Sequence, residues 1–268
     1  MNSKVVTTVI TVGLVFSNLQ YSSAQTQTGA ELIKKMQAAY AGLKSYSQKT
    51  SATGKVTIQG NAKLNGMTAE FRYQSPNKAF VLVSSPTTGA LACFSNGRDF
   101  TVYQSTDNVY TKLPAVSDLQ GFVKALAPFS IAATLDPLYF AEKLTLKDLI
   151  SSWQLKPSVK INGVNCQVVQ GHLIKKLLIG GTFATVTYWI DDQYFIRKLS
   201  IEWKGIPIQI RSSQPSTKGK QKASPTVLMD RTITEVVQDL KINPPLTDAD
   251  FTYPVPKNAR EIKASTPK

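Results

Sequence analysis

Groups that carry enzyme chemistry are scarce in this chain of 268 residues. Its one histidine, His172, has no GxSxG elbow beside it in the sequence, and glycine-rich phosphate loops of the GxGxxG or GxxxxGK type are missing. One histidine and two distant cysteines match no zinc spacing. The adjacent acids Asp191 and Asp192 fall in a predicted turn, where aspartate is favoured for its backbone geometry. The sequence therefore predicts a protein that is not an enzyme and that uses no metal and no cofactor.

Acidic residues are also few, since 17 Asp and Glu stand against 31 Lys and Arg, for a formal net charge of +14. Such an excess favours anionic partners, such as phospholipid head groups, lipopolysaccharide or nucleic acid. The basic residues are densest in the polar stretch 211–225, a predicted flexible loop that carries Arg211, Lys218, Lys220 and Lys222. These four residues are candidates for contact with an anionic membrane surface. The alternative is a solvated loop with ordinary lysines.

Long apolar runs are missing except for Val5 to Phe16, which follows Lys4 and is too short to span a bilayer. The run leads to the small residues Ser22 to Ala24, so residues 1–24 are predicted to be a secretory signal peptide that is cut after Ala24. The alternative is an uncleaved membrane anchor. A cleaved leader implies a soluble periplasmic protein, and export argues against nucleic acid as the partner. No linker divides residues 25–268, which should form a single domain.

Cysteine is limited to Cys93 and Cys166. In an oxidising compartment a disulfide could join them, and closing so long a loop would stabilise the fold by roughly 4 kcal/mol. Both cysteines lie in apolar, strand-like runs, so two buried free thiols are the alternative. The sequence leaves both possibilities open.

What is present is mostly a pattern of short β-strands. A capping box at Thr28 to Glu31 begins an amphipathic helix, predicted over residues 29–45. Turn signals then separate predicted strands at 55–59, 68–73, 79–84, 90–94, 99–104 and 109–113, and later at 159–161, 165–170, 183–203, 208–211 and 227–242. Between these groups lies a helical insert, residues 115–152, with helices predicted at 117–126, 136–143 and 146–151. The proline-rich segment 243–256 should close the sheet at an edge.

The stretch Phe183 to Trp203 predicts a long antiparallel hairpin with two unlike faces. On its second arm one face is mostly apolar and holds Phe195, Arg197, Leu199, Ile201 and Trp203. The other is mostly polar and holds Ile196, Lys198, Ser200, Glu202 and Lys204. Helices are too few to cover a flat sheet built of such strands, and soluble proteins rarely expose a large apolar face. The predicted fold is therefore α+β, with a curved antiparallel sheet, a half-barrel, that is closed by the N-terminal helix and the central helical insert.

Six segments stand out in order along the chain: LIKKMQAAYAGLKSYS, AEFRYQSPNKAFV, SNGRDFTVYQSTDNVYTKLPA, INGVNCQVVQG, TVTYWIDDQYFIRKLSI and NPPLTDADFTYPVPKNARE. Together they resemble the periplasmic lipoprotein-carrier superfamily of LolA-, LolB-, LppX- and LprG-like proteins, and within it a branch of predicted periplasmic proteins. The resemblance implies a LolA-like half-barrel in which helices close a cavity for the acyl chains of lipids or lipoproteins. A dry apolar wall is enough for such cargo, because each buried CH2 contributes ~0.8 kcal/mol.

Alternation along the strands, taken with this resemblance, gives candidate ligand-binding residues. Those on strands are Phe71, Tyr73, Phe100, Val102, Phe195, Arg197, Leu199, Ile201 and Trp203, and those on the helical insert, which would form a lid, are Phe122, Leu126, Leu138 and Tyr139. Each apolar residue could instead be ordinary core. Arg72 and Arg197 are candidates for a basic residue at the cavity mouth that binds a head group, and the alternative for Arg197 is snorkelling to the rim.

The sequence thus predicts an exported carrier that encloses the acyl chains of a lipid or an acylated protein. The alternative is an envelope sensor of the same fold that detects lipids and signals to a membrane partner.

Overall fold

The computed structural model describes residues 27–126, 150–173, 184–209 and 226–263. The predicted signal peptide, the helix expected at 136–143, the lid candidates Leu138 and Tyr139, and the basic residues Arg211, Lys218, Lys220 and Lys222 lie outside the described residues.

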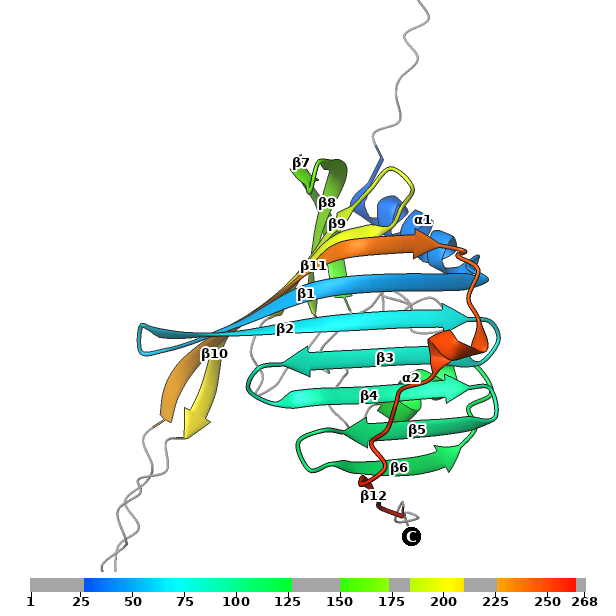
Figure 1. Ribbon diagram of the computed structural model, residues 1–268. Coiled ribbons are helices and arrows are strands. Elements are labelled where there is room, and N and C mark those ends of the chain that lie inside the picture. Colours follow the sequence, from blue (N-terminus) through cyan, green and yellow to red (C-terminus); the bar gives the residue numbers. More distant parts are fainter. Residues whose placement is uncertain (1–26, 127–149, 174–183, 210–225, 264–268) are drawn as a thin grey trace, which may run out of the picture.

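One twelve-stranded sheet organises the described chain (Figure 1), in the order β12-β6-β5-β4-β3-β2-β1-β11-β10-β9-β8-β7. Its strands are β1 (Ser45–Ile58), β2 (Asn61–Gln74), β3 (Lys78–Ser85), β4 (Gly89–Asn96), β5 (Asp99–Gln104), β6 (Val109–Pro114), β7 (Ile150–Ile161), β8 (Val164–Leu173), β9 (Ala184–Ile190), β10 (Ile196–Gln209), β11 (Thr226–Ile242) and β12 (Arg260–Glu261). The pairings are antiparallel except for that of β12 with β6, which is parallel. The predicted antiparallel sheet is confirmed.

Two of its hairpins turn on a residue followed by glycine. Gln59-Gly60 joins β1 to β2 and Asn162-Gly163 joins β7 to β8, and all four residues have positive φ. Two consecutive positive φ values define the tight turn whose twist matches that of paired strands, and glycine takes this conformation at no steric cost. The turn at Gln59-Gly60 lets β1 and β2 pair along their whole length, from Ser45 opposite Gln74 to Ile58 opposite Asn61.

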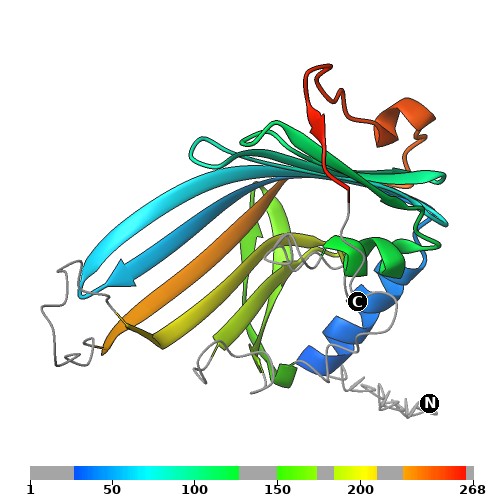
Figure 2. The same ribbon diagram turned by 90° about the horizontal axis from the view of Figure 1, so that it is seen from below.

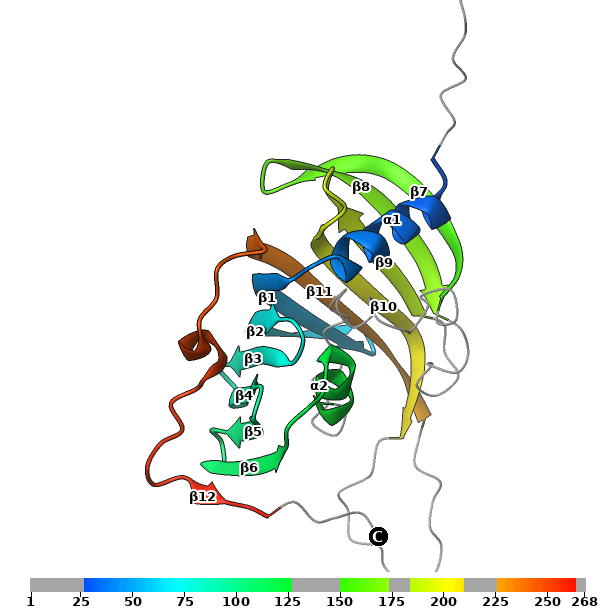
Figure 3. The same ribbon diagram turned by 90° about the vertical axis from the view of Figure 1, so that its right-hand side faces the viewer.

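Curvature divides the molecule into an inner and an outer side. Figure 2 shows the helices α1 (Gly29–Ala41) and α2 (Leu119–Leu126) on the concave side of the bent sheet, and Figure 3 shows the sheet bending around them. Helix α1 lies against β7 and β8, and α2 lies against β3. The core lies between these helices and the concave face. Closure of the half-barrel by the rest of the insert stays a prediction.

Helix α1 begins as the sequence predicts. The Thr28 hydroxyl accepts the Glu31 N–H at 3.2 Å, and the Glu31 carboxylate accepts the Thr28 N–H at 2.8 Å, so both ends of the capping box are made. Leu32, Ile33, Met36 and Tyr40 on its inner stripe are buried. The helix ends at Ala41, before the predicted residue 45, because Ser45 already pairs in β1.

Of two helices predicted in the insert, the structure confirms one and contradicts the end of the other. The helix predicted at 117–126 is confirmed as α2, which Asp118 caps by accepting the Gly121 N–H at 2.7 Å. The helix predicted at 146–151 is wrong at its end, because Ile150 and Ser151 pair with Leu173 and His172 as the start of β7. Of the strand expected at 208–211, residues 208 and 209 form the end of β10 rather than a strand of their own, and residues 210 and 211 lie outside the described residues.

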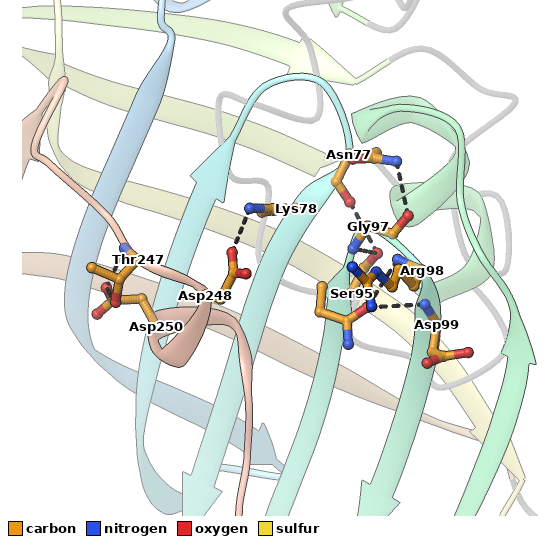
Figure 4. Close-up of polar contacts among 10 residues, drawn as sticks. Asn77, Lys78, Ser95, Gly97, Arg98, Asp99, Thr247, Asp248 and Asp250 are labelled. Atoms are coloured by element: carbon orange, nitrogen blue, oxygen red, sulfur yellow. Dashed lines mark hydrogen bonds and ion pairs between the residues drawn. The ribbon is translucent and has the colours of Figure 1, made fainter.

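After β11 the chain forms a strap, residues 243–263, that crosses the convex side of the sheet (Figure 2). Its short 3-10 helix η5 (Asp248–Phe251) places the Asp248 carboxylate 2.5 Å from the Lys78 ammonium of β3 (Figure 4). The Phe251 side chain is fully buried, and the Tyr253 ring stacks on Tyr103 at 5.5 Å. The edge pairing predicted for 243–256 falls a few residues later, at β12.

Candidate functional site

Cross-strand register shows which side chains share the concave face. Tyr46, Tyr73, Ala79 and Phe100 lie in one row across β1, β2, β3 and β5, with Ser95 of β4 between the last two. The next row holds Gln48, Phe71, Val81, Cys93 and Val102. In the other half of the sheet Leu199 is opposite Tyr188, and Ile201 is opposite Val186. Residues from both halves of the sheet thus share the inner surface, and Ile150 of the edge strand β7 joins the same cluster.

The described candidates on this surface gather in a single apolar cluster. Its buried members include Tyr73, Phe100, Val102, Phe122, Leu126, Phe195, Leu199 and Ile201, and Phe71 and Trp203 pack against it. The structure therefore brings together the candidates that the alternation selects. Whether they contact a ligand stays a prediction.

Burial separates these candidates into two groups. Phe100 and Phe122 are fully buried with their rings 5.3 Å apart, edge to face, so they fasten α2 to the sheet as core. Phe71 and Trp203 are half-buried although they face the interior. The sequence patterns did not select other half-buried residues of this kind, among them Val83, Leu91 and Leu240. These half-buried side chains are the surface that remains for a ligand.

Small and polar residues form the middle of the concave face. Along β1 the inner positions after Gln48 are Thr50, Ala52 and Gly54, and Ala52 is opposite the buried carboxyl side chain of Glu235. The Thr50 hydroxyl is buried and has no hydrogen-bond partner among the described residues. Strand propensity gives no signal for such positions, because polar residues on a strand usually predict the solvent face.

Arg197 is held by the turn that precedes it. Its Nε donates to Asp191 Oδ2 at 2.7 Å, and Asp191 also accepts the backbone N–H groups of Gln193 and Phe195. A shift of register between Ile196 and Lys198 places Arg197 at a β-bulge. Ile196, predicted on the polar face, is buried, because the bulge changes the alternation at this point.

Arg72, the second candidate for a basic residue at the mouth, faces the strap instead. Its Nη1 donates to the Asp250 carbonyl oxygen at 2.8 Å, its Nη2 lies 2.5 Å from Glu70 Oε1, and its guanidinium lies over the Phe80 ring. The prediction of a mouth position for Arg72 is wrong, since its neighbour Phe71 takes the concave side.

Of the two possibilities that the sequence leaves open for the cysteines, the structure has the two buried free thiols. Cys93 and Cys166 are both free and buried. They lie on β4 and β8, which six other strands separate in the sheet order. Burial raises the pKa of each thiol above its usual range, so both stay protonated and inert.

A hollow of about 370 Å³ lies on the convex side between the strap and the sheet. Its lining mixes aromatic, apolar and basic residues: Phe94, Thr101, Tyr110, Lys112, Val255, Pro256, Lys257 and Ala259. No catalytic arrangement is formed by these residues.

Within the residues that the structure describes, no group of three His, Cys, Asp or Glu side chains could hold a metal ion. In that part of the chain, no helix is long and apolar enough to cross a membrane.

The chain belongs to the DUF2092 family, described as predicted periplasmic proteins, whose model matches residues 29–264. Comparison with curated proteins gives no match.

Among solved structures, the lipoprotein LppX of Mycobacterium tuberculosis aligns with a TM-score of 0.45 at 14% identity, covering 82% of this chain and 97% of its own. LprF of Mycobacterium bovis aligns with 0.41 at 13% identity, covering 85% and 97%. The Pseudomonas aeruginosa MucA/MucB complex aligns with 0.39 at 10% identity, covering 84% of this chain and 60% of that one. The family model confirms the branch of predicted periplasmic proteins that the sequence resembles.

Proposed function

We propose that the protein is an exported carrier that holds the acyl chains of a lipid or a lipoprotein against the concave face of its sheet, without chemistry. The observation that carries the proposal is the set of half-buried apolar side chains on that face, Phe71, Val83, Leu91, Trp203 and Leu240. These apolar groups face the interior but stay partly exposed to water. A hydrocarbon chain that covers them is stabilised by ~0.8 kcal/mol for each CH2 removed from water.

Electrostatics on this face support acyl chains as the bound part of the cargo. The Arg197 guanidinium is paired with Asp191, and Arg72 contacts the strap on the outer side. Among the described residues of the concave face, Glu235 carries a buried carboxyl group. An anionic head group would therefore be better placed outside this surface, with the acyl chains inside.

Periplasmic export after cleavage at Ala24 belongs to the proposal, and the family's description as predicted periplasmic proteins supports it. Non-enzymatic action also belongs to it. His172 is exposed at the end of β8, and its Nδ1 lies 3.3 Å from the Thr185 hydroxyl.

Native mass spectrometry of the protein purified from its own periplasm, followed by lipid extraction, tests the carrier. Co-purifying phospholipid or acylated peptide is expected, and a protein that is empty and takes up no fluorescent fatty-acid probe would overturn the proposal.

A pair of tryptophan variants localises the site. Trp203 is half-buried on the concave face, whereas the half-buried Trp189 of β9 lies on the opposite face beneath the Lys198 ammonium, 4.5 Å from its ring. Trp203→Asp is expected to weaken probe binding by roughly ten-fold or more, and Trp189→Asp to leave it unchanged. Equal losses in two folded variants would contradict a concave-face site.

The sensor of the same fold is the second candidate, and it differs in its partner. A carrier exchanges cargo with membranes or acylated proteins, whereas a sensor stays bound to a membrane protein until lipid displaces it. Crosslinking in the periplasm, with and without added lipid, separates the two.

A further inference from the structure

Two leucines in the described chain are far more exposed than its other large apolar side chains. Leu64 is 66% exposed and Leu228 is 63% exposed, while Leu155, Val159 and Ile262 reach 41–43%. Single exposed apolar residues are ordinary on a surface. These two are unusual because they share one end and one face of the sheet.

Strand length brings them together. Strands β1, β2 and β10 have 14 residues and β11 has 17, and their ends reach past the rest of the sheet in one direction (Figures 1 and 2). Leu64 is opposite Lys55, which is opposite Thr232, so Leu64 and Thr232 share a face. Leu228 is four residues from Thr232 along β11 and therefore lies on that face too. This face is the convex one, because Trp203 and Ile233 take the other side.

We call the projecting ends of β1, β2, β10 and β11 the tip, and we propose that the tip docks on a bilayer that contains anionic phospholipid, with Leu64 and Leu228 inserted among the lipid head groups. An exposed apolar side chain flanked by basic ones is the arrangement that places a protein at a membrane interface. The inference goes beyond the proposed function and does not depend on it.

The positive charge of the tip favours a bilayer that contains anionic phospholipid as the partner. The tip carries the basic residues Lys55, Lys63, Lys204 and Arg231 and the acids Glu202 and Asp230. Both acids are already engaged, since Asp230 accepts the Gly205 N–H at 2.9 Å and Glu202 lies 3.8 Å from Lys204. Basic residues beside a surface of anionic lipid are attracted to it.

The tip also lies next to the wall that is proposed to hold acyl chains. Arg231 on the concave side of the tip places its guanidinium 5.6 Å from the centre of the Trp203 ring. Docking at the tip would therefore bring the bilayer near Trp203, one of the residues of the proposed acyl-chain surface.

Vesicle binding tests the docking. The full mature chain is sedimented with vesicles of phosphatidylcholine alone or mixed with phosphatidylglycerol. Binding to the mixed vesicles is expected, with binding to phosphatidylcholine alone weaker by roughly ten-fold or more. The double variant Leu64→Ser/Leu228→Ser should lose most of this binding, and Leu155→Ser/Val159→Ser, which removes exposed apolar side chains from the edge strand β7, should keep it.

Probe uptake and oligomeric state distinguish membrane docking from cargo binding and from dimer formation. The tip variant should take up the fatty-acid probe as the unchanged protein does, so failure of docking and failure of the carrier function are distinguishable. Its elution volume in size-exclusion chromatography should also be unchanged. Equal vesicle binding by the two double variants would overturn the proposal, as would a tip variant that merely converts a dimer to a monomer.

Discussion

The Nε of Arg197 lies 2.7 Å from Oδ2 of Asp191, and this pair closes the β9–β10 hairpin. The Asp191 side chain is 1% exposed and that of Arg197 is 25% exposed. Asp191 Oδ1 accepts the N–H groups of Gln193 at 3.0 Å and Phe195 at 2.8 Å. The alternation of the strand places Arg197 on the apolar face, but its guanidinium instead stabilises the turn by pairing with Asp191.

Replacing Asp191 should destabilise the fold strongly. Asp191→Ala leaves the Arg197 guanidinium and two backbone donors without their acceptor, and breaking a buried pair costs about 3–5 kcal/mol, which we discount to about 2–3 kcal/mol because Arg197 is partly solvated. Urea denaturation measures the change in the free energy of unfolding. The exposed neighbour provides the control, since Asp192→Ala should change it by under about 0.5 kcal/mol. Equal effects of the two substitutions would show that the pair is not a determinant of stability.

The same hairpin shows where sequence patterns succeed and where they stop. Alternation correctly places Leu199, Ile201 and Trp203 inside, because beyond the bulge the strand keeps its period of two. It places Ile196 outside, whereas the bulge turns this residue inward and its N–H donates to the Tyr40 hydroxyl of α1 at 3.1 Å. The hydrogen-bond acceptor for the backbone at this bulge lies 156 positions away along the chain, so the neighbouring sequence does not indicate the bulge.

Long-range pairing also decides the segments that local patterns predict wrongly. Ile150 and Ser151 fit a helical pattern locally, but their pairing with β8 decides their conformation. Nothing near Arg72 in the sequence indicates its partner. The strap whose carbonyl oxygen accepts its hydrogen bond comes almost two hundred positions later in the chain. Local signals such as the capping box at Thr28 and the turn residue Gly60 are readable, because their causes lie within a few residues.

Gly171 should not tolerate a side chain. A Cβ at this inner position of β8 would lie 2.3 Å from Ile150 Cγ2 and 2.9 Å from Trp153 Cε3, so both large side chains on β7 would have to move. We expect Gly171→Ala to lower the free energy of unfolding by about 1–3 kcal/mol, the usual cost of overpacking. Thermal and urea denaturation measure it. Gly66→Ala is the matched control on β2, where a Cβ meets nothing within 4 Å, and a loss as large there would show that packing is not the cause.

The two cysteines should react slowly with a thiol reagent in the native protein. Both are buried, and burial raises the pKa of the Cys93 thiol and that of the Cys166 thiol, so little thiolate is present at neutral pH. Two reactive thiols per chain are expected in denaturant and almost none without it. Mass spectrometry under non-reducing conditions gives the cross-check, because a mass lower by two hydrogens after periplasmic export would mean that a disulfide forms after all.

Acid should loosen the strap before it unfolds the sheet. The Lys78 ammonium, by its hydrogen bond and its charge, lowers the pKa of Asp248 from its ordinary value of 3.8, and the backbone N–H and hydroxyl of Thr247 lower the pKa of Asp250. Because each folded-state pKa lies below the unfolded one, the stabilisation is complete above pH 3.8 and is lost as the pH falls through the lowered values. We therefore expect the amide signals of Phe251 and Arg260 to move together below pH 3.8, ahead of those of β1 and β2.

Nuclear magnetic resonance titration of the mature protein measures this transition, and one substitution assigns it. Asp248→Asn removes a carboxylate that loses its contact on protonation, so the strap signals should already be displaced at neutral pH and should shift less in acid. Asp239→Asn is the matched control, since Asp239 pairs with Lys241 at 3.6 Å on β11 rather than with a residue of β3 or η5. If strap and sheet signals change at the same pH in all three proteins, the strap does not open separately and its ion pair with Lys78 does not hold it.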